Sequence, residues 1–333
     1  MIDWIQIISN AAQEIISPTT AAYALAALGL AIHFGFTGLL NFGQAGFMAL
    51  GAYGFAIATL TFEWPVWAAI LFGVVGSIVF ALILGIPTLR LRADYLAIVT
   101  IAAAEIVRLL FTTNTFVEVT GSANGLQGYK GGFAALNPLL LFTDNESVLW
   151  GFGPWVYNPY DWWVRIFGWG LVAIAAFITW RLFKSPWGRV IKGIREDEDA
   201  VRALGKNVYF YKMQSLVIGG VFGALAGVIF ILPRAVVPSN YQTSLTFFIY
   251  AILLLGGAAT VFGPIIGSVI FWVLLSFFSG FIARAVEVGW LPFLTNVQAG
   301  QLRFILVGVA IMLIVIYRPQ GIFGNKKELA FVK

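Results

Sequence analysis

The sequence contains no cysteine and a single histidine, His33. Without thiols the chain can form neither disulfides nor thiolate metal sites. One histidine and no clustered carboxylates also argue against a metal centre built from protein ligands alone. We therefore expect no bound metal and no cofactor.

Charge is scarce as well. Only 11% of the residues are charged and 60% are hydrophobic, whereas soluble domains are typically about 25% charged. Apolar stretches of about 20 residues, the length that crosses a bilayer, recur along most of the chain. They lack the strict alternation of a membrane β-barrel. The sequence therefore predicts an all-α polytopic membrane protein, and its net charge of +5 reflects helix orientation, not nucleic-acid binding.

The apolar segments predict one transmembrane domain, residues 1–333, built as a helical bundle of about nine spans, with eight to ten as the range. Basic residues concentrate in cytoplasmic loops. Arg90, Arg92 and the basic C-terminal tail are therefore expected inside, which places the N-terminus outside. The expected spans are residues 19–36, 44–61, 66–86, 94–112, 164–183, 213–232, 245–262, 264–282 and 302–317.

Residues 184–212, KSPWGRVIKGIREDEDAVRALGKNVYFYK, form a strongly charged segment. A charged side chain at the bilayer centre costs roughly 2.5–3.5 kcal/mol on insertion scales, so this segment is expected in the cytoplasm. Pro186 and Gly188 are expected to break the incoming helix. Residues 191–204 are then predicted to be one helix that ends at Gly205, with Glu198 and Arg202 spaced to pair. On charge alone, the segment is either a solvated loop or a docking element.

The long loop at residues 113–163 falls on the opposite, extracytoplasmic side in this topology. Its charges are mostly acidic, with Glu118, Asp144, Glu146 and Asp161 against Lys130. It is also rich in tryptophan and tyrosine, which favour the membrane interface.

Residues 35–53, GFTGLLNFGQAGFMALGAY, combine many glycines with two amide side chains at membrane depth. Glycines allow close helix packing. They also allow broken helices, whose free backbone groups must face protein or a water-filled cavity. The segment is therefore either densely packed or part of a translocation path, which would be lined by Asn41, Gly43, Gln44 and Gly46.

Glu105 and Arg108 lie one turn apart in a predicted span and are expected to form a buried ion pair, with a gating or substrate contact as the alternative. His33 is expected to be packed or hydrogen-bonded. Glycines repeat every four residues at Gly219 and Gly223, and again at Gly227, which predicts a close helix contact.

The sequence contains no phosphate-binding loop of the form GxxxxGK[ST], because the Gly205-Lys206 pair lacks the first glycine and the final hydroxyl residue. We also find no nucleophile–base pair. The chain is therefore not expected to be an enzyme, and any ATP hydrolysis would occur on another polypeptide.

Five stretches, in order along the chain, resemble the LivM-type permeases of bacterial branched-chain amino acid ABC importers, to which urea and amide permeases are closely related. Gln44 stands where many of these permeases have histidine, and Ala259 where a third glycine is usual. The stretches are GLLNFGQAGFMALGAY, LRADYLAIVTIAAAEIVRLL with TGSANGL after it, SPWGRVIKGIREDEDAVRALGKNV, GGAATVFGPIIGS and YRPQGIFG.

The resemblance implies a multi-pass permease subunit in the bacterial plasma (inner) membrane, which imports leucine, isoleucine, valine or related small solutes. Its implied partners are a second homologous permease subunit, two cytoplasmic ATPase subunits, an extracytoplasmic substrate-binding protein and the lipid bilayer, but no nucleic acid. In such permeases a short cytoplasmic coupling helix with an acidic–small–small–xxx–Gly pattern docks into the ATPase. By this pattern the expected ATPase contacts are Gly188, Arg195, Asp197, Glu198, Asp199, Ala200, Arg202 and Gly205.

A second hypothesis is a self-sufficient ion-coupled secondary transporter or channel. It would use His33 or the Glu105–Arg108 pair as its ion-linked element.

Overall fold

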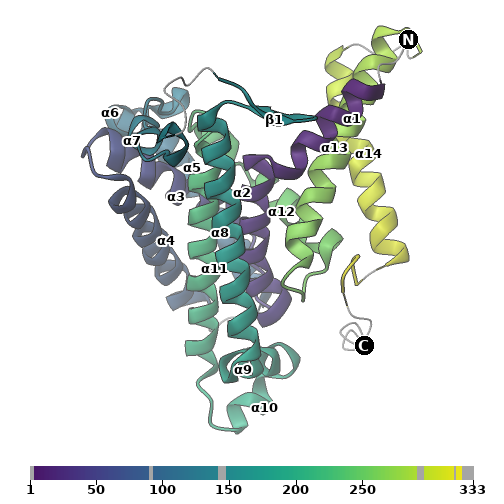
Figure 1. Ribbon diagram of the computed structural model, residues 1–333. Coiled ribbons are helices and arrows are strands. Elements are labelled where there is room, and N and C mark those ends of the chain that lie inside the picture. Colours follow the sequence, from purple (N-terminus) through teal and green to yellow (C-terminus); the bar gives the residue numbers. More distant parts are fainter. Residues whose placement is uncertain (1–3, 90–92, 142–147, 291–295, 319, 325–333) are drawn as a thin grey trace.

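A computed structural model describes residues 4–89, 93–141, 148–290, 296–318 and 320–324. The described chain is predominantly helical (Figure 1). Arg90, Arg92, Lys326, Lys327 and Lys333, on which part of the expected orientation rests, lie outside the described residues.

Within the residues that the structure describes, six helices are long and apolar enough to cross a membrane. Shorter apolar helical stretches occur in α3 (Gln44–Leu60), α12 (Thr243–Gly256) and the Gly300–Val309 part of α14 (Asn296–Tyr317). Each predicted span falls on one of these helices, so the chain is a polytopic helical membrane protein. The six long helices are α2 with its extension η2 (Pro18–Leu30, Ala31–Phe36), α4 (Val66–Thr88), α5 (Ala93–Thr112), α8 (Pro159–Lys184), α11 (Val208–Ile231) and α13 (Gly263–Glu287).

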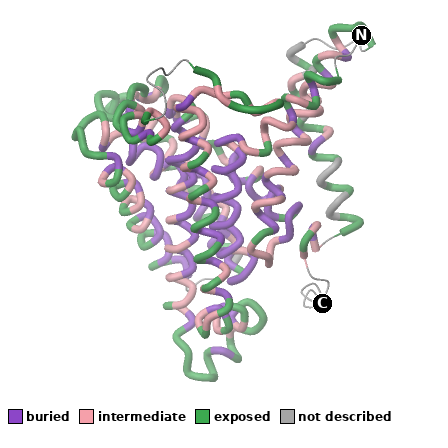
Figure 2. Tube along the Cα trace, viewed as in Figure 1, coloured by how far each residue is buried: buried purple, intermediate pink, exposed green. Residues whose placement is uncertain are grey.

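Helices α2 and α11 form the centre of the bundle, where buried residues gather (Figure 2). Helix α2 starts at Pro18, after Ser17 accepts a hydrogen bond from the Thr20 amide, and is rich in alanine. A helix that is apolar on every side must be surrounded by protein or lipid. In the outer helices α4, α5, α8 and α13, at most 39% of the apolar stretch is buried within the protein, as in a lipid-facing layer.

Glycines set the distance between the central helices, as their four-residue spacing predicted. A Cβ added to Gly29 of α2 would lie 2.5 Å from the Gly219 carbonyl oxygen of α11. A Cβ on Gly227 would lie 2.0 Å from the Met48 carbonyl oxygen of α3. Any side chain at these positions would force the backbones apart, so the glycines serve packing.

The first span is not a regular α-helix to its end. Its last turn, η2 (Ala31–Phe36), is π-helical, and residues 38–43 are irregular before α3 begins at Gln44. Short π-helical segments inside helices often accompany functional sites. The break separates two helices that both belong to the buried centre.

The loop after α5 folds into short elements at one end of the bundle (Figure 1). It differs from the all-α expectation, because β1 (Trp150–Phe152) and β2 (Trp155–Tyr157) form an antiparallel hairpin. Alternating aromatic residues on either side of a Gly-Pro turn explain it. The helical elements are η3 (Asn114–Phe116), α6 (Val117–Thr120), η4 (Ser122–Asn124), α7 (Gly131–Ala135) and η5 (Pro138–Leu141).

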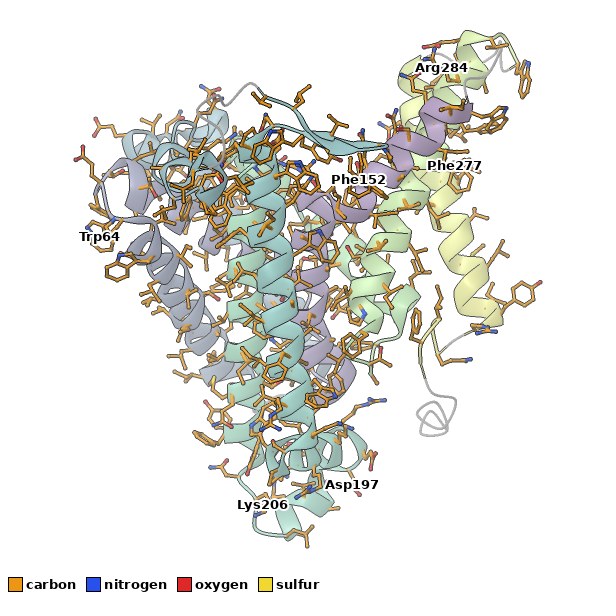
Figure 3. The ribbon with its side chains drawn as sticks, viewed as in Figure 1. Trp64, Phe152, Asp197, Lys206, Phe277 and Arg284 are labelled. Carbon is orange, nitrogen blue, oxygen red and sulfur yellow. The ribbon has the colours of Figure 1, made fainter. Side chains whose placement is uncertain are left out.

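The hairpin connects this loop to the N-terminal helices α1 (Trp4–Gln13) and η1 (Glu14–Ile16). The Trp155 indole donates to the Ala12 carbonyl at 3.0 Å, and the Gln13 amide donates to the Pro154 carbonyl at 2.8 Å. At the opposite end of the bundle, helices α9 (Pro186–Glu196) and α10 (Glu198–Ala203) project beyond all the other described elements, with Asp197 and Lys206 near their tip (Figure 3).

Candidate functional site

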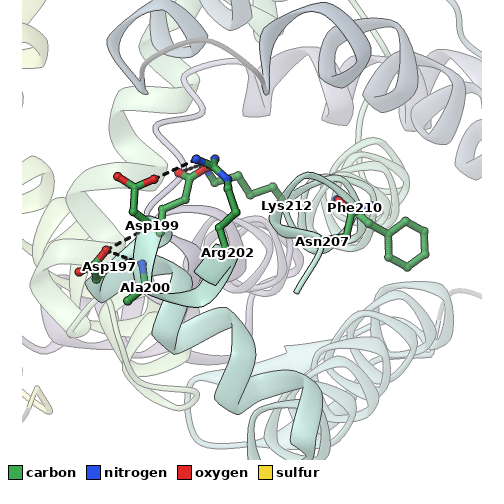
Figure 4. A network of polar contacts seen from close by, with 8 residues as sticks. Asp197, Asp199, Ala200, Arg202, Asn207, Phe210 and Lys212 are labelled. Atoms are coloured by element: carbon green, nitrogen blue, oxygen red, sulfur yellow. Dashed lines mark hydrogen bonds and ion pairs between the residues drawn. The ribbon is translucent and has the colours of Figure 1, made fainter. Parts of the chain in front are cut away.

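The charged segment forms two short helices, where the sequence predicted one helix over residues 191–204. Helix α9 begins directly after the Ser185 cap with Pro186 in its first turn, so Gly188 lies inside a helix and not at its break. The chain bends at Asp197, whose carboxylate accepts hydrogen bonds from the amides of Asp199 and Ala200, both at 3.0 Å (Figure 4). Aspartate is a favoured N-cap, and this cap starts the second helix.

Gly205 ends α10 as predicted, because its φ of +76° lies in the left-handed region. A Cβ at Gly205 would meet no atom within 4 Å. The position therefore requires glycine for backbone conformation and not for space.

Charges on α10 pair with one another and with α11. Arg202 donates to Glu198 at 2.8 Å and to Asp199 at 2.9 Å, and the Lys212 ammonium donates to the other Glu198 oxygen (Figure 4). The predicted Glu198–Arg202 pair is thus present. Exposed pairs contribute roughly 0.2–1 kcal/mol each, so their main effect is to orient α10 on the end of α11.

The end of helix α10 also exposes an apolar side chain that the sequence did not lead us to predict. Leu204, next to Gly205, is 79% exposed. Its position beside a helix-ending glycine, within a charged segment outside the membrane, was the available signal. A single exposed leucine is common on protein surfaces, so it is the position of Leu204 at the projecting end of α10 that makes it a candidate contact for another protein.

Helix α9 is anchored to the bundle by its inner face. Ile191 and Ile194 are buried, and Gly188 lies against the backbone of Phe183. The Arg195 guanidinium donates to the Gly35 carbonyl of η2 at 2.5 Å. Of the predicted ATPase contacts, Gly188 is buried and Glu198 is half-buried, while Arg195, Asp197, Asp199, Ala200, Arg202 and Gly205 are exposed. The exposed Arg195 also donates to η2 through its guanidinium.

A cavity of about 300 Å³ lies beside the point where α9 contacts the bundle. The Arg195, Glu198 and Lys212 side chains line it on one side, with Gly38 and Leu39 on the other. The charged segment and the break after η2 thus both line this cavity and contact each other beside it.

Several signature stretches of the sequence converge on this break. Gly35 lies so close to Ala258, in the glycine-rich loop after α12, that an added Cβ would be 1.7 Å from its carbonyl oxygen. The Phe42 amide donates to the Thr100 hydroxyl of α5 at 3.0 Å. The C-terminal stretch contacts the end of α12, where the Ile322 amide donates to the Leu255 carbonyl at 3.0 Å.

A buried polar network continues from the break into the bundle. The Asn41 amide nitrogen lies 2.9 Å from His33 Nδ1, and His33 Nε2 lies 3.1 Å from the Leu216 carbonyl. Because a carbonyl only accepts, these partners assign the His33 proton to Nε2 and the acceptor role to Nδ1. His33 is therefore packed and hydrogen-bonded, as expected.

Asn41 and Gln44 are also fully buried. The Asn41 side-chain oxygen accepts from the Gly43 amide at 2.8 Å, while Gln44 donates to the carbonyls of Ala26 and Gly219 at 3.2 and 3.4 Å. A Cβ added to Gly46 would lie 3.0 Å from Ala104 of α5. In this conformation Asn41 and Gln44 connect the start of α3 with the first span and α11, whereas Gly43 and Gly46 pack against α5. All four predicted path residues are buried.

Glu105 and Arg108 form the expected pair within α5, with the Arg108 Nε 2.9 Å from Glu105 Oε1. The pair is less buried than predicted, because the Glu105 and Arg108 side chains are 38% and 18% exposed. One turn of helix α5 carries both residues, so the pair stabilises its own helix and does not bridge two helices.

Known proteins resemble this chain over nearly its whole length. Residues 14–316 match the family of the branched-chain amino acid transport system permease component. The high-affinity branched-chain amino acid transport system permease proteins LivM of Salmonella typhimurium and Escherichia coli are each 30% identical to it, over 92% of this chain and 69% of theirs. A probable branched-chain amino acid transport permease LivM of Methanocaldococcus jannaschii is 29% identical, over 91% of both chains. The chain belongs to the family of permease components of branched-chain amino acid transport systems.

Proposed function

We propose that the chain is the transmembrane permease subunit of an ATP-driven importer of leucine, isoleucine and valine in a plasma membrane. One observation carries the proposal: a charged helix pair stands clear of an apolar bundle, yet Arg195 connects it directly to the broken central helix. A partner that moves α9 and α10 would therefore move the centre of the bundle.

The proposed topology has nine spans, with the N-terminus outside and the C-terminus in the cytoplasm. Residues 184–212 form the cytoplasmic coupling loop, since α8 ends and α11 begins there. Residues 113–163 form the extracytoplasmic loop. This placement is supported by the described elements of the loop, which lie at the end of the bundle opposite α9 and α10 (Figure 1).

The ATPase contact is proposed at the exposed tip of the pair. Asp197, Asp199, Ala200 and Arg202 would contact the ATPase directly, and Glu198 orients Arg202. Gly205 gives the tip its shape, and Leu204 supplies an apolar anchor. Gly188 and Arg195 act on the inner side, where they hold α9 against the bundle.

Asn41, Gly43, Gln44 and Gly46 are proposed to border the translocation path when α2 and α11 separate. The carbonyls and amides that they now satisfy would then become available to a solute or to water. Packed interfaces switch between discrete arrangements, so the buried network suits a closed conformation.

The complete importer would also contain two ATPases, a second homologous permease and an extracytoplasmic substrate-binding protein. Gentle detergent extraction from the native membrane, followed by mass spectrometry of the co-purifying chains, tests this composition. A second permease and an ATPase are the expected companions. A chain that purifies alone and transports leucine without ATP would contradict the proposal and favour ion-coupled transport.

A further inference from the structure

We propose that Arg234 and the hydrogen-bond donors around it form a binding point for the carboxylate of the transported amino acid, at the extracytoplasmic end of the bundle. The inference rests on the proposed function, which supplies both the amino acid and the orientation of this end. It adds a substrate-binding residue that no sequence motif indicated.

The backbone around Arg234 is held in place. Arg234 follows α11, at the end away from α9 and α10. Val236 and Leu126 exchange backbone hydrogen bonds of 2.9 and 3.1 Å. The Tyr129 hydroxyl donates to the Ile231 carbonyl at 3.0 Å and to that of Arg234 at 2.5 Å. These contacts fix the loop without using the Arg234 guanidinium.

The guanidinium is half-buried and forms no ion pair with the residues that the structure describes. It donates to the Thr19 hydroxyl at 2.5 Å and stands over the Phe230 ring, 4.2 Å from its centroid. No carboxylate of the residues that the structure describes lies within 4.0 Å of it. Burial lowers the pKa of Arg234 from its ordinary value, but guanidinium remains charged in proteins. Glu14 acts on the guanidinium electrostatically but forms no direct ion pair with it. A half-buried cation without a direct counter-ion is costly, and a bound anion would offset this cost.

Unused donors belong to the same aromatic cluster. The Tyr241 and Tyr53 hydroxyls and the Trp272 indole nitrogen are buried and have no hydrogen-bond partner among the described residues. Tyr241 lies 6.1 Å from Phe230 and 6.3 Å from Tyr53, measured between ring centroids. An unmade buried hydrogen bond costs about 1–3 kcal/mol, so several unused donors in one cluster indicate a missing acceptor.

The chemistry of this set selects a carboxylate. Guanidinium and indole groups only donate, and burial raises the pKa of the Tyr241 hydroxyl, which keeps it a neutral donor. A carboxylate only accepts and can take several hydrogen bonds at once. The rings of Phe230, Tyr23 and Tyr241 would meanwhile contact a branched apolar side chain, as apolar walls do in small-molecule sites.

Equilibrium binding of radiolabelled leucine to the full-length chain, purified with its partner subunits but without the binding protein, tests the proposal. The competitors are 4-methylpentanoate, which keeps the carboxylate and lacks the ammonium, and leucinol, which lacks the carboxylate. We expect 4-methylpentanoate to compete and leucinol to fail. Arg234→Gln is expected to weaken leucine binding at least tenfold and to remove competition by 4-methylpentanoate, and Arg234→Lys to retain part of both.

Arg165→Gln is the matched control, because Arg165 also lies over an aromatic ring, that of Tyr157, at 3.4 Å from its centroid. It should bind leucine like the wild type. Equal competition by leucinol, absence of leucine binding by the wild type, or unchanged binding in Arg234→Gln would each overturn the proposal. ATP-driven leucine uptake by the reconstituted wild-type importer distinguishes failure of this inference from failure of the proposed function. If the wild type imports leucine but Arg234→Gln binds leucine normally, only the inference about Arg234 is refuted.

Discussion

The Arg195 guanidinium of α9 donates to the Gly35 carbonyl of η2 at 2.5 Å, so a helix outside the apolar bundle contacts the broken end of the most buried one. The Arg195 side chain also fills the space in front of Gly38, where an added Cβ would lie 3.4 Å from it. A displacement of α9 must therefore move η2 or break this contact.

Arg195→Ala removes the contact between α9 and η2. A hydrogen bond to a charged group is worth about 1.5–3 kcal/mol, so we expect roughly a tenfold loss of solute imported per ATP hydrolysed, with ATPase assembly retained. Uptake and ATP hydrolysis, measured together in proteoliposomes, give this ratio. Arg189→Ala, on the exposed side of the same helix, is the control, and an unchanged ratio in Arg195→Ala would refute the coupling role.

Leu204→Ser tests the apolar anchor at the tip. Burying a leucine against a partner contributes about 1.5–3 kcal/mol, so the affinity for the ATPase should fall about tenfold, while the permease itself stays as stable. Co-purification at graded ATPase concentrations measures the affinity. Leu141→Ser removes a comparably exposed leucine, 86% accessible, from the proposed extracytoplasmic loop and should leave it unchanged. Normal ATPase binding by Leu204→Ser would exclude this contact.

Gly205→Val places a β-branched residue at a φ of +76°. The left-handed conformation costs an L-residue roughly 1–2 kcal/mol, so the end of α10 should change shape and transport should be uncoupled while membrane insertion continues. Membrane abundance and uptake are the two measurements. Gly170→Val, at an open position of α8, should alter neither, and normal uptake in Gly205→Val would count against the docking role.

Asn41→Leu distinguishes a structural network from a solute contact. It leaves His33 and the Gly43 amide without their partners, at about 1–3 kcal/mol for each buried group. We expect a lower denaturation temperature together with reduced uptake, whereas the exposed Asn124→Leu should show neither change. A changed KM at an unchanged denaturation temperature would indicate that Asn41 acts only as a solute contact.

The sequence was sufficient to predict the helices, the charged segment and the glycine contacts, because hydrophobic length, charge and small residues act locally. Gly205 is an example: its position at the end of a charged helix predicted its left-handed conformation. The division of that helix at Asp197 was missed, because aspartate both fits a helical run and caps a new one. The β1–β2 hairpin was missed because its strands are only three residues long.

The direction in which side chains point could not be predicted. Arg195 lies among exposed charges in the sequence, and only the packing of α9 against η2 turns its guanidinium inward. The Arg234 cluster draws its aromatic residues from α2, α3, α11, η6 (Pro238–Tyr241) and α13, which are distant in the sequence. No local sequence pattern predicts that these residues come into contact.

The central claim is that ATPases drive this permease through α9 and α10. The most direct measurement is leucine uptake into proteoliposomes that contain the chain with its partner subunits and binding protein, with ATP inside or outside and with a protonophore present. We predict uptake that requires ATP on the side of α9 and α10, persists with the protonophore and fails in Gly205→Val. Uptake that proceeds without ATP and stops with the protonophore would contradict the account.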